Sequence, residues 1–226
     1  MKHFGGWAFA LLLVLSSFSQ AQSLDMCNAV DFSTILMPPI TAPDAFVLAM
    51  TLSGSYEGPK GWANLSDNFD GEGMSFGLLQ QNFGTGSLQP LLIEMRDNYP
   101  TQFQEYFSSQ DLQNLLGMLA QWEANKSDSQ SVKWAVNNLY VGGSFIPRWK
   151  EELTNLAQSP EYVSIQAEAG MAIHASALRD VSVIGVDEVR TYLLAFDVEV
   201  HGGGFYPEDF RDYATWLKQN QVALTI

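Results

Sequence analysis

The sequence has a single cysteine, few basic residues and only one long apolar run. Because Cys27 has no partner, an intramolecular disulfide is excluded and the fold must be stabilised by packing. There are 11 Lys and Arg residues against 25 Asp and Glu residues, a formal net charge of −14. This balance argues against nucleic acid as a partner, since phosphate binding requires clustered Lys and Arg. It permits a cationic ligand.

The apolar run lies near the N-terminus, from Trp7 to Leu15, between Lys2 and the small residues of Ser19-Gln20-Ala21. A basic start, a short apolar stretch and small residues at a cleavage position are typical of a signal peptide. We therefore predict a signal peptide at 1–21 and export to the periplasm or the extracellular space. The run is too short to span a bilayer, and no later run is long and charge-free enough, so we expect no membrane insertion.

Residues 22–226 are enough for one hydrophobic core and do not require a second, so we predict a single domain. We expect a monomer. Apolar residues recur at three- and four-residue spacing along most of this domain, which predicts helices. The first should start at Thr41-Ala42-Pro43-Asp44 and run to about Tyr56, with Leu52 on its inner face. The other predicted helices cover 88–95, 112–122, 132–139, 163–178, 189–196 and 210–217, and Pro147 and Pro160 mark helix starts.

The last predicted helix should face inward with Phe210, Ala214 and Leu217. Trp134, Trp149 and Trp216 are also expected in the core. By contrast, the segment from Gly58 to Gly86 carries seven glycines and one short apolar stretch, which predicts loops around a small sheet. The predicted fold class is therefore α+β and mainly α-helical.

One helix of this set ends near an acid, Glu57, and the glycine-rich segment that follows contains Asp70. Cleavage of a glycosidic bond needs two such groups, an acid that protonates the leaving oxygen and a carboxylate that activates water or stabilises positive charge. We expect Tyr56 and Trp62 to exclude water from Glu57 and so raise its pKa. Asp70, among glycines, should remain solvated and ionised.

The same stretch resembles a known family. Glu57, then Asp70-Gly71-Glu72-Gly73-Met74-Ser75-Phe76-Gly77, then Phe83-Gly84-Thr85-Gly86, is similar to the catalytic region of the glycoside hydrolase family 46 chitosanases. Farther on, Tyr192 to Gly203, with Asp197 and His201, resembles a helix of that family that ends in His-Gly. The resemblance implies a lysozyme-like fold with a small sheet beside the active-site cleft. It covers most of residues 43–205.

By this resemblance Glu57 is the general acid, Asp70 is the base-side carboxylate, and Ser75 helps Asp70 to orient the attacking water. The family inverts the anomeric carbon, which requires carboxyl groups about 6.5–9.5 Å apart. The sequence departs from the family at Ser87, where the chitosanases carry an aspartate that holds a glucosamine amine. The spacer between Glu57 and Asp70 is also shorter than in the family.

A second resemblance points to another polymer. Gly77-Leu78-Leu79-Gln80 resembles the strand of lytic transglycosylases and goose-type lysozymes, whose substrate is peptidoglycan. Gln80 and Gln81 would then bind sugar hydroxyls or acetamides, or else simply lie on an exposed sheet face. Tyr56, Trp62, Asp197 and His201 are further candidates for contacts with the sugar, and His201 for a helix cap or a cleft wall. His174, on an Ala-rich helix, is interpreted as a core histidine.

The pattern thus predicts a secreted glycoside hydrolase that cleaves a β-1,4-linked aminosugar polymer. Peptidoglycan is placed ahead of chitosan as the polysaccharide substrate. The alternatives are a chitosanase and, from another class, a non-catalytic wall-binding protein that keeps the lysozyme fold. Since no His, Cys or carboxylate group has the spacing of a zinc site or a calcium loop, we predict no metal and no cofactor.

Overall fold

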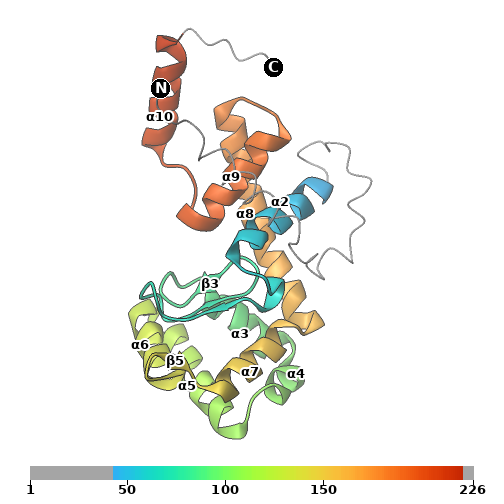
Figure 1. The fold of residues 1–226 in the computed structure, drawn as a ribbon, viewed down its shortest axis with the longest axis vertical. Helices are drawn as coiled ribbons and strands as arrows, with labels where there is room; N and C mark the ends of the chain where they lie inside the picture. Colours follow the sequence, from blue (N-terminus) through green and yellow to red (C-terminus); the bar gives the residue numbers. More distant parts are fainter. Residues whose placement is uncertain (1–42, 221–226) are drawn as a thin grey trace, which may run out of the picture.

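The structure is a computed structural model that describes residues 43–220. The predicted signal peptide and Cys27 lie outside these residues. Most of the described chain is helical, and its strands are short (Figure 1). Within the described residues no helix is long and apolar enough to cross a membrane.

The first helix, α2, spans Pro43–Glu57, as the sequence predicted. A short 3-10 helix, η4 (Gly61–Ala63), leads into a three-stranded antiparallel sheet of β1 (Leu65–Ser66), β2 (Ser75–Phe76) and β3 (Gln81–Asn82), in that order. This confirms the small sheet predicted between Gly58 and Gly86. Each strand has only two residues, so the sheet depends on side chains from elsewhere to hold it in place.

The middle of the chain forms a helical layer against this sheet. It comprises α3 (Leu88–Asn98), α4 (Pro100–Glu105), α5 (Ser109–Asn125), α6 (Asp128–Asn138), the hairpin of β4 (Tyr140–Val141) and β5 (Ser144–Phe145), and α7 (Pro147–Ala157). The apolar spacing predicted α3, α5 and α6, and Pro147 begins α7 as expected. The hairpin and α4 were not anticipated.

Three helices complete the described chain: α8 (Pro160–Ile184), α9 (Val189–Gly202) and α10 (Pro207–Gln219). The 25-residue α8 is the predicted central helix, and it begins at Pro160. Figure 1 shows α8 running from the sheet and the green and yellow helices to α2 and α9. Its two ends belong to different parts of the core.

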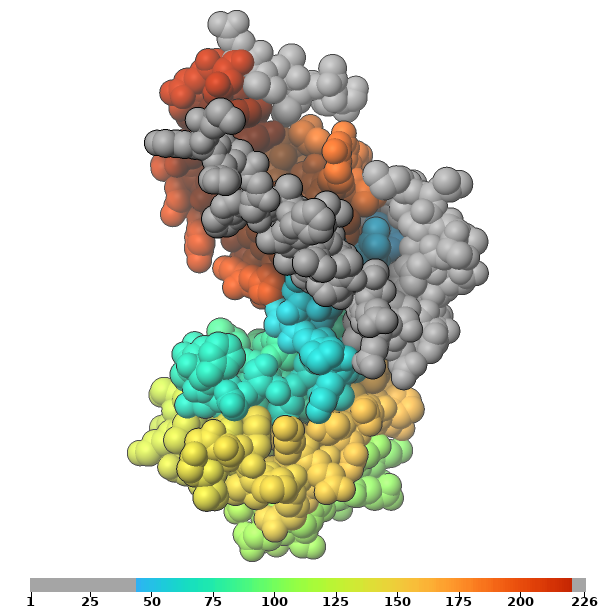
Figure 2. All heavy atoms as spheres, in the orientation of Figure 1, coloured from blue at the N-terminus to red at the C-terminus, as the bar shows by residue number. Residues whose placement is uncertain are grey.

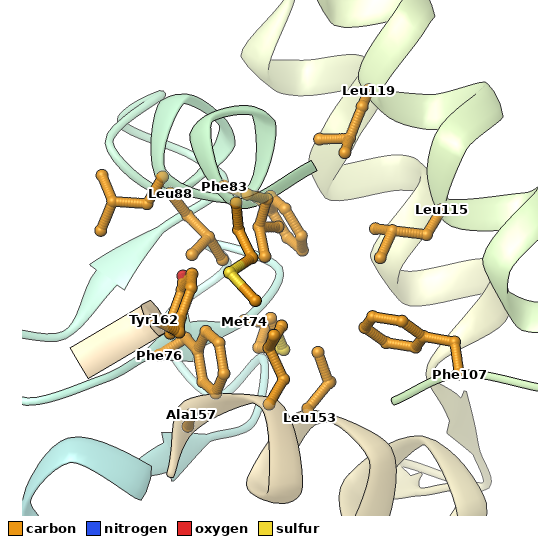
Figure 3. Packing of buried hydrophobic residues seen from close by; sticks show 14 of the residues in the cluster. Met74, Phe76, Phe83, Leu88, Phe107, Leu115, Leu119, Leu153, Ala157 and Tyr162 are labelled. Carbon is orange, nitrogen blue, oxygen red and sulfur yellow. The ribbon is translucent and has the colours of Figure 1, made fainter. Parts of the chain in front are cut away.

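One hydrophobic cluster lies between the sheet and the helices α3 to α8. Figure 3 shows Met74, Phe76 and Phe83 of the sheet region facing Leu115 of α5 and Leu153 of α7. A second cluster joins α2, the far half of α8 and α9, with Ala49, Ala177 and Phe196 fully or almost fully buried. α2, and with it Glu57, is therefore packed on the second cluster, whereas the sheet is packed mainly on the first.

The structure corrects several expectations about burial. α10 has no buried residue, since Phe210 and Leu217 are only half-buried and Ala214 is exposed. Trp216 is also exposed, although Trp149 lies in the core and Trp134 packs against it. Leu52 is 38% exposed and does not belong to the second cluster, which α2 covers with other residues. An apolar pattern predicts a helical face, but the tertiary structure decides whether that face is covered.

Candidate functional site

Glu57 is the last residue of α2, at the point where the helix meets the turn that leads to the sheet. Its side chain is 17% exposed. Burial raises the pKa of Glu57, the nearby His201 lowers it, and the negative charge of Asp197 raises it again, with a net rise. A carboxylate at a helix C-terminus also faces the negative end of the helix dipole, which favours its neutral form. Glu57 therefore has the surroundings of a proton donor.

The turn after Glu57 is held by Asn64, which is buried. The Asn64 amide nitrogen donates to the Gly58 carbonyl at 3.2 Å, and its amide oxygen accepts from the backbone nitrogen of Lys60 at 2.9 Å. The Asn64 carbonyl in turn accepts from the Gly77 nitrogen at 2.9 Å. One side chain and its own backbone therefore connect the end of α2 to the sheet, which fixes the Glu57 backbone relative to it.

Asp70 lies in the exposed turn between β1 and β2. One of its carboxylate oxygens accepts from the Glu72 nitrogen at 3.0 Å, and the side chain remains in solvent as expected. Burial raises the pKa of Tyr140, and the negative charges of Asp67 and Asp70 raise it further, so both carboxylates lie close to this phenol. The Tyr140 hydroxyl donates to the Gly73 carbonyl at 2.7 Å and holds the base of the turn.

A hollow separates the sheet from α9 on one face of the molecule. Figure 2 shows the surface indented between the teal residues of the sheet region and the orange residues of α9, with the cyan segment that follows α2 at its inner side. α2 ends at this indentation. A separate cavity of about 450 Å³ lies between the β1–β2 turn and the β4–β5 hairpin. Its lining includes Asp67, Phe69, Tyr140 and Gly142, and the Phe69 side chain is 80% exposed.

α2 and α9 bring four polar residues together next to this hollow. His201 Nδ1 lies 3.2 Å from Glu57 Oε1, and His201 Nε2 lies 3.5 Å from Asp197 Oδ1. The Ser53 hydroxyl donates to the same Asp197 oxygen at 2.8 Å. Asp197 and His201 were expected to contact sugar, which stays a prediction, and the structure places them close to the predicted acid. Sequence reasoning missed Ser53 entirely, because nothing in its local pattern marks it.

The remaining aromatic candidates differ in position. Tyr56 is 74% exposed, so it does not exclude water from Glu57, and that expectation is wrong. Trp62 is half-buried against the second hydrophobic cluster, and its carbonyl accepts from the Gln166 amide at 3.4 Å. Water is therefore excluded from Glu57 by the packing of α2 against α9 rather than by Tyr56.

The polar candidates on the sheet are less accessible than expected. Gln81 is buried, which contradicts its predicted place on an exposed face. The Gln80 amide accepts from the Ser66 hydroxyl at 2.8 Å and donates to the Gly77 carbonyl at 2.9 Å, so it already has protein partners. Ser75 is buried on β2, and within the described residues no hydrogen bond joins it to Asp70. These three side chains help to shape the sheet, and their part in sugar binding stays a prediction.

Two other predictions concern histidine and metals. His174 is half-buried rather than a full core residue; its ring packs on Phe46 and Tyr192 of the second cluster, and its Nδ1 atom lies 2.6 Å from the Tyr192 hydroxyl. Among residues 43–220 there is no group of three or more His, Cys, Asp or Glu side chains that could hold a metal ion.

Comparison of the chain with models of protein families, with curated proteins and with solved structures finds no match.

Proposed function

We propose that this protein is an exported, lysozyme-like glycoside hydrolase that cleaves a β-1,4-linked aminosugar polymer, with peptidoglycan ahead of chitosan as the substrate. The observation that carries the proposal is the setting of Glu57. Its carboxyl is largely removed from water at a helix end, its pKa is raised by burial, and the segment that follows its helix lies at the inner side of a surface hollow and leads into a glycine-rich sheet. This is the setting that a general acid requires.

In the proposed reaction Glu57 gives its proton to the glycosidic oxygen as the bond from that oxygen to the anomeric carbon breaks. A water molecule attacks the anomeric carbon from the opposite face and gives a proton to the ionised carboxylate of Asp70. No direct contact joins Glu57 to Asp70 among the described residues, and none is needed, because an inverting enzyme leaves room for this water. Asp70, exposed in its turn, is accessible to such a water.

Chitosan remains the second candidate because of the residues near Asp70. Asp67 lines the cavity, Asp70 acts on the Tyr140 phenol that also lines it, and Phe69 offers an exposed ring on which a sugar could stack. A free amine on the sugar would be attracted to these carboxylates. By contrast, the Ser87 hydroxyl accepts from the Asn82 nitrogen at 2.9 Å and so belongs to the local turn. Asp67 could therefore replace the amine-binding aspartate that the chitosanases carry at the position of Ser87.

The test is Glu57→Gln in the purified protein without its signal peptide, offered peptidoglycan sacculi, deacetylated sacculi and chitosan. The substitution removes the transferable proton and keeps the shape of the side chain. We expect release of reducing ends to fall by about a hundredfold to ten-thousandfold on the preferred polymer. The preferred polymer among the three identifies the substrate.

Glu199→Gln is the matched control, since it makes the same chemical change on α9 in a carboxyl that contacts Asp180 and Ser176. It should leave the rate unchanged. If the wild-type protein binds sacculi and releases no reducing ends from any of the three polymers, the non-catalytic wall-binding alternative is correct. If Glu57→Gln retains the wild-type rate, the assignment of Glu57 is wrong.

A further inference from the structure

We propose that His201 and Asp197 are positioning residues for Glu57, and that His201 holds and restores the proton that Glu57 donates. This inference rests on the proposed function, because it assigns to the two residues a task in the same reaction. It replaces the contacts with sugar that the sequence predicted for them.

Four side chains form a row of contacts, here called the ladder, between α2 and α9: Ser53, Asp197, His201 and Glu57. Ser53 and Glu57 are four residues apart on α2, and Asp197 and His201 are four residues apart on α9, so each pair lies on one helical face. The contacts run from the Ser53 hydroxyl to Asp197 Oδ1 at 2.8 Å, from Asp197 Oδ1 to His201 Nε2 at 3.5 Å, and from His201 Nδ1 to Glu57 Oε1 at 3.2 Å.

Burial changes along this ladder in a direction that suits proton transfer. Ser53 is only 1% exposed, whereas the side chain of His201 is 49% exposed. The buried hydroxyl anchors Asp197, and the half-exposed imidazole meets the solvent. Ser53 is not a nucleophile in this arrangement, because it is buried and its hydroxyl faces a carboxylate rather than the imidazole.

The contact with Asp197 favours one tautomer of the imidazole. A carboxylate only accepts hydrogen bonds, so Asp197 Oδ1, 3.5 Å away, favours a hydrogen on His201 Nε2. Nδ1 then faces Glu57. When His201 is neutral, Nδ1 accepts the hydrogen of the protonated Glu57 carboxyl, and when His201 is charged, Nδ1–H donates to the Glu57 carboxylate. One proton can therefore move between Glu57 Oε1 and His201 Nδ1, which lie 3.2 Å apart.

This exchange answers a need of the proposed reaction. Each cleavage takes the proton from Glu57, and the acid must regain one before the next cycle. A proton from solvent can reach His201, which is half-exposed, and pass from Nδ1 to Glu57 Oε1. Because both ring nitrogens already face carboxylates, neither is free to bind a sugar hydroxyl.

The first experiment is a carbon-13 NMR titration of the Glu57 carboxyl in the whole protein without its predicted signal peptide and without substrate. The signal is assigned by its loss in Glu57→Gln. His201→Gln removes a positive charge next to Glu57, so we expect the Glu57 midpoint to rise by about half a pH unit or more. Glu199→Gln, two residues from His201 on α9, should leave the midpoint of the Glu57 titration unchanged. An unchanged Glu57 midpoint in His201→Gln would overturn the proposal.

A reciprocal measurement keeps the test decisive if His201→Gln is unstable. The interaction between two titrating groups is mutual, so the proton NMR titration of the His201 ring must change in Glu57→Gln. Ser53→Ala should also shift the Glu57 titration, by less than His201→Gln, since it loosens Asp197 without removing a charge. A His201 ring that titrates identically with and without the Glu57 carboxyl contradicts the ladder.

The rate of reaction supplies a separate readout. kcat/KM should fall at alkaline pH as Glu57 loses its proton, and His201→Gln should move this alkaline limb upward by the same shift that NMR reports. kcat at neutral pH should fall several-fold because reprotonation is slower. The two proposals fail differently: activity retained in Glu57→Gln contradicts the proposed function, whereas lost activity with an unmoved Glu57 titration in His201→Gln contradicts only the positioning role.

Discussion

Gly77 joins the sheet to the central helix through a close backbone approach. Its φ is +87°, and a Cβ atom at this position would lie 2.2 Å from the Gln166 amide oxygen. That oxygen accepts from the Leu78 nitrogen at 2.9 Å, while the Gln166 amide nitrogen donates to the Trp62 carbonyl. A single buried side chain of α8 therefore holds both flanks of the β1–β2 region.

Gly77→Ala should destabilise the protein by about 2–3 kcal/mol, since it adds backbone strain and displaces the Gln166 amide. Urea unfolding followed by circular dichroism measures the loss. Gly117→Ala is the matched control, because Gly117 is helical and nothing lies within 4 Å of its added Cβ. It should stabilise by up to about 1 kcal/mol. Equal effects of the two substitutions would contradict this account of Gly77.

Individual site residues were predictable to different degrees. Glu57 and Asp70 stand in a local pattern, a helix end followed by glycines, and the structure places them at that helix end and in an exposed turn. The contact between Glu57 and His201 was not predictable, because 144 positions separate them and only the packing of α2 on α9 brings them together. The prediction that Tyr56 covers Glu57 was wrong because adjacent residues on a helix face different directions.

Among the elements, α8 contributes to both hydrophobic clusters, and its first turn is capped by Ser159. The Ser159 hydroxyl accepts from the Tyr162 nitrogen at 3.2 Å, and Pro160 occupies the first turn. Ser127, at the start of α6, has the same position in its helix but makes no such capping bond. The two serines therefore form a natural comparison.

Ser159→Ala should cost about 1 kcal/mol of stability, because a buried helix start loses its capping acceptor. Ser127→Ala should cost no more than a few tenths of that amount. Thermal unfolding of the two variants side by side measures the difference. A loss in Ser127→Ala as large as that in Ser159→Ala would show that the cap of α8 makes no special contribution.

Element prediction succeeded where the local pattern was strong. Regular apolar spacing and Pro147 and Pro160 at helix starts located α3 and α5 to α9. The β4–β5 hairpin was missed because each strand has two residues, which is too short for an alternating pattern. α10 was located correctly, but none of its residues is buried, and Phe210 and Leu217 are only half-buried. Helix existence is a local property, whereas burial is not.

At the scale of the whole molecule the dominant electrostatic feature is the formal net charge of −14. Together with Asp67 in the cavity lining and Asp70 near Tyr140, it creates a negative field that attracts cations. Salt screens such a field, since the Debye length falls from about 10 Å at 0.1 M to about 3 Å at 1 M ionic strength. The charge of the preferred polymer should therefore determine how its KM depends on salt concentration.

If the preferred polymer carries free amines, KM for it should rise several-fold between low and high salt while kcat changes little. A fully acetylated polymer of the same length, which is neutral, is the control and should show no such rise. Asp67→Asn should weaken the salt dependence for the amine-bearing polymer. An equal rise in KM for both polymers would contradict an electrostatic origin.

The class of the fold, mainly helical with a small antiparallel sheet, followed from the sequence, but the division of the core did not. Regular spacing shows which side chains are apolar and cannot show that they gather into two clusters. That division arises because α8 is long enough to extend from one cluster to the other.

An unbroken helix that joins the two clusters has a mechanical consequence. Its only proline is in the first turn, and its buried Gly170 is pressed against Met50, so it offers no flexible joint between the halves. We therefore expect the two halves of the protein to keep their relative positions when a ligand binds. With a bound oligosaccharide short enough to add little scattering mass, small-angle X-ray scattering should therefore give the same radius of gyration as for the free protein.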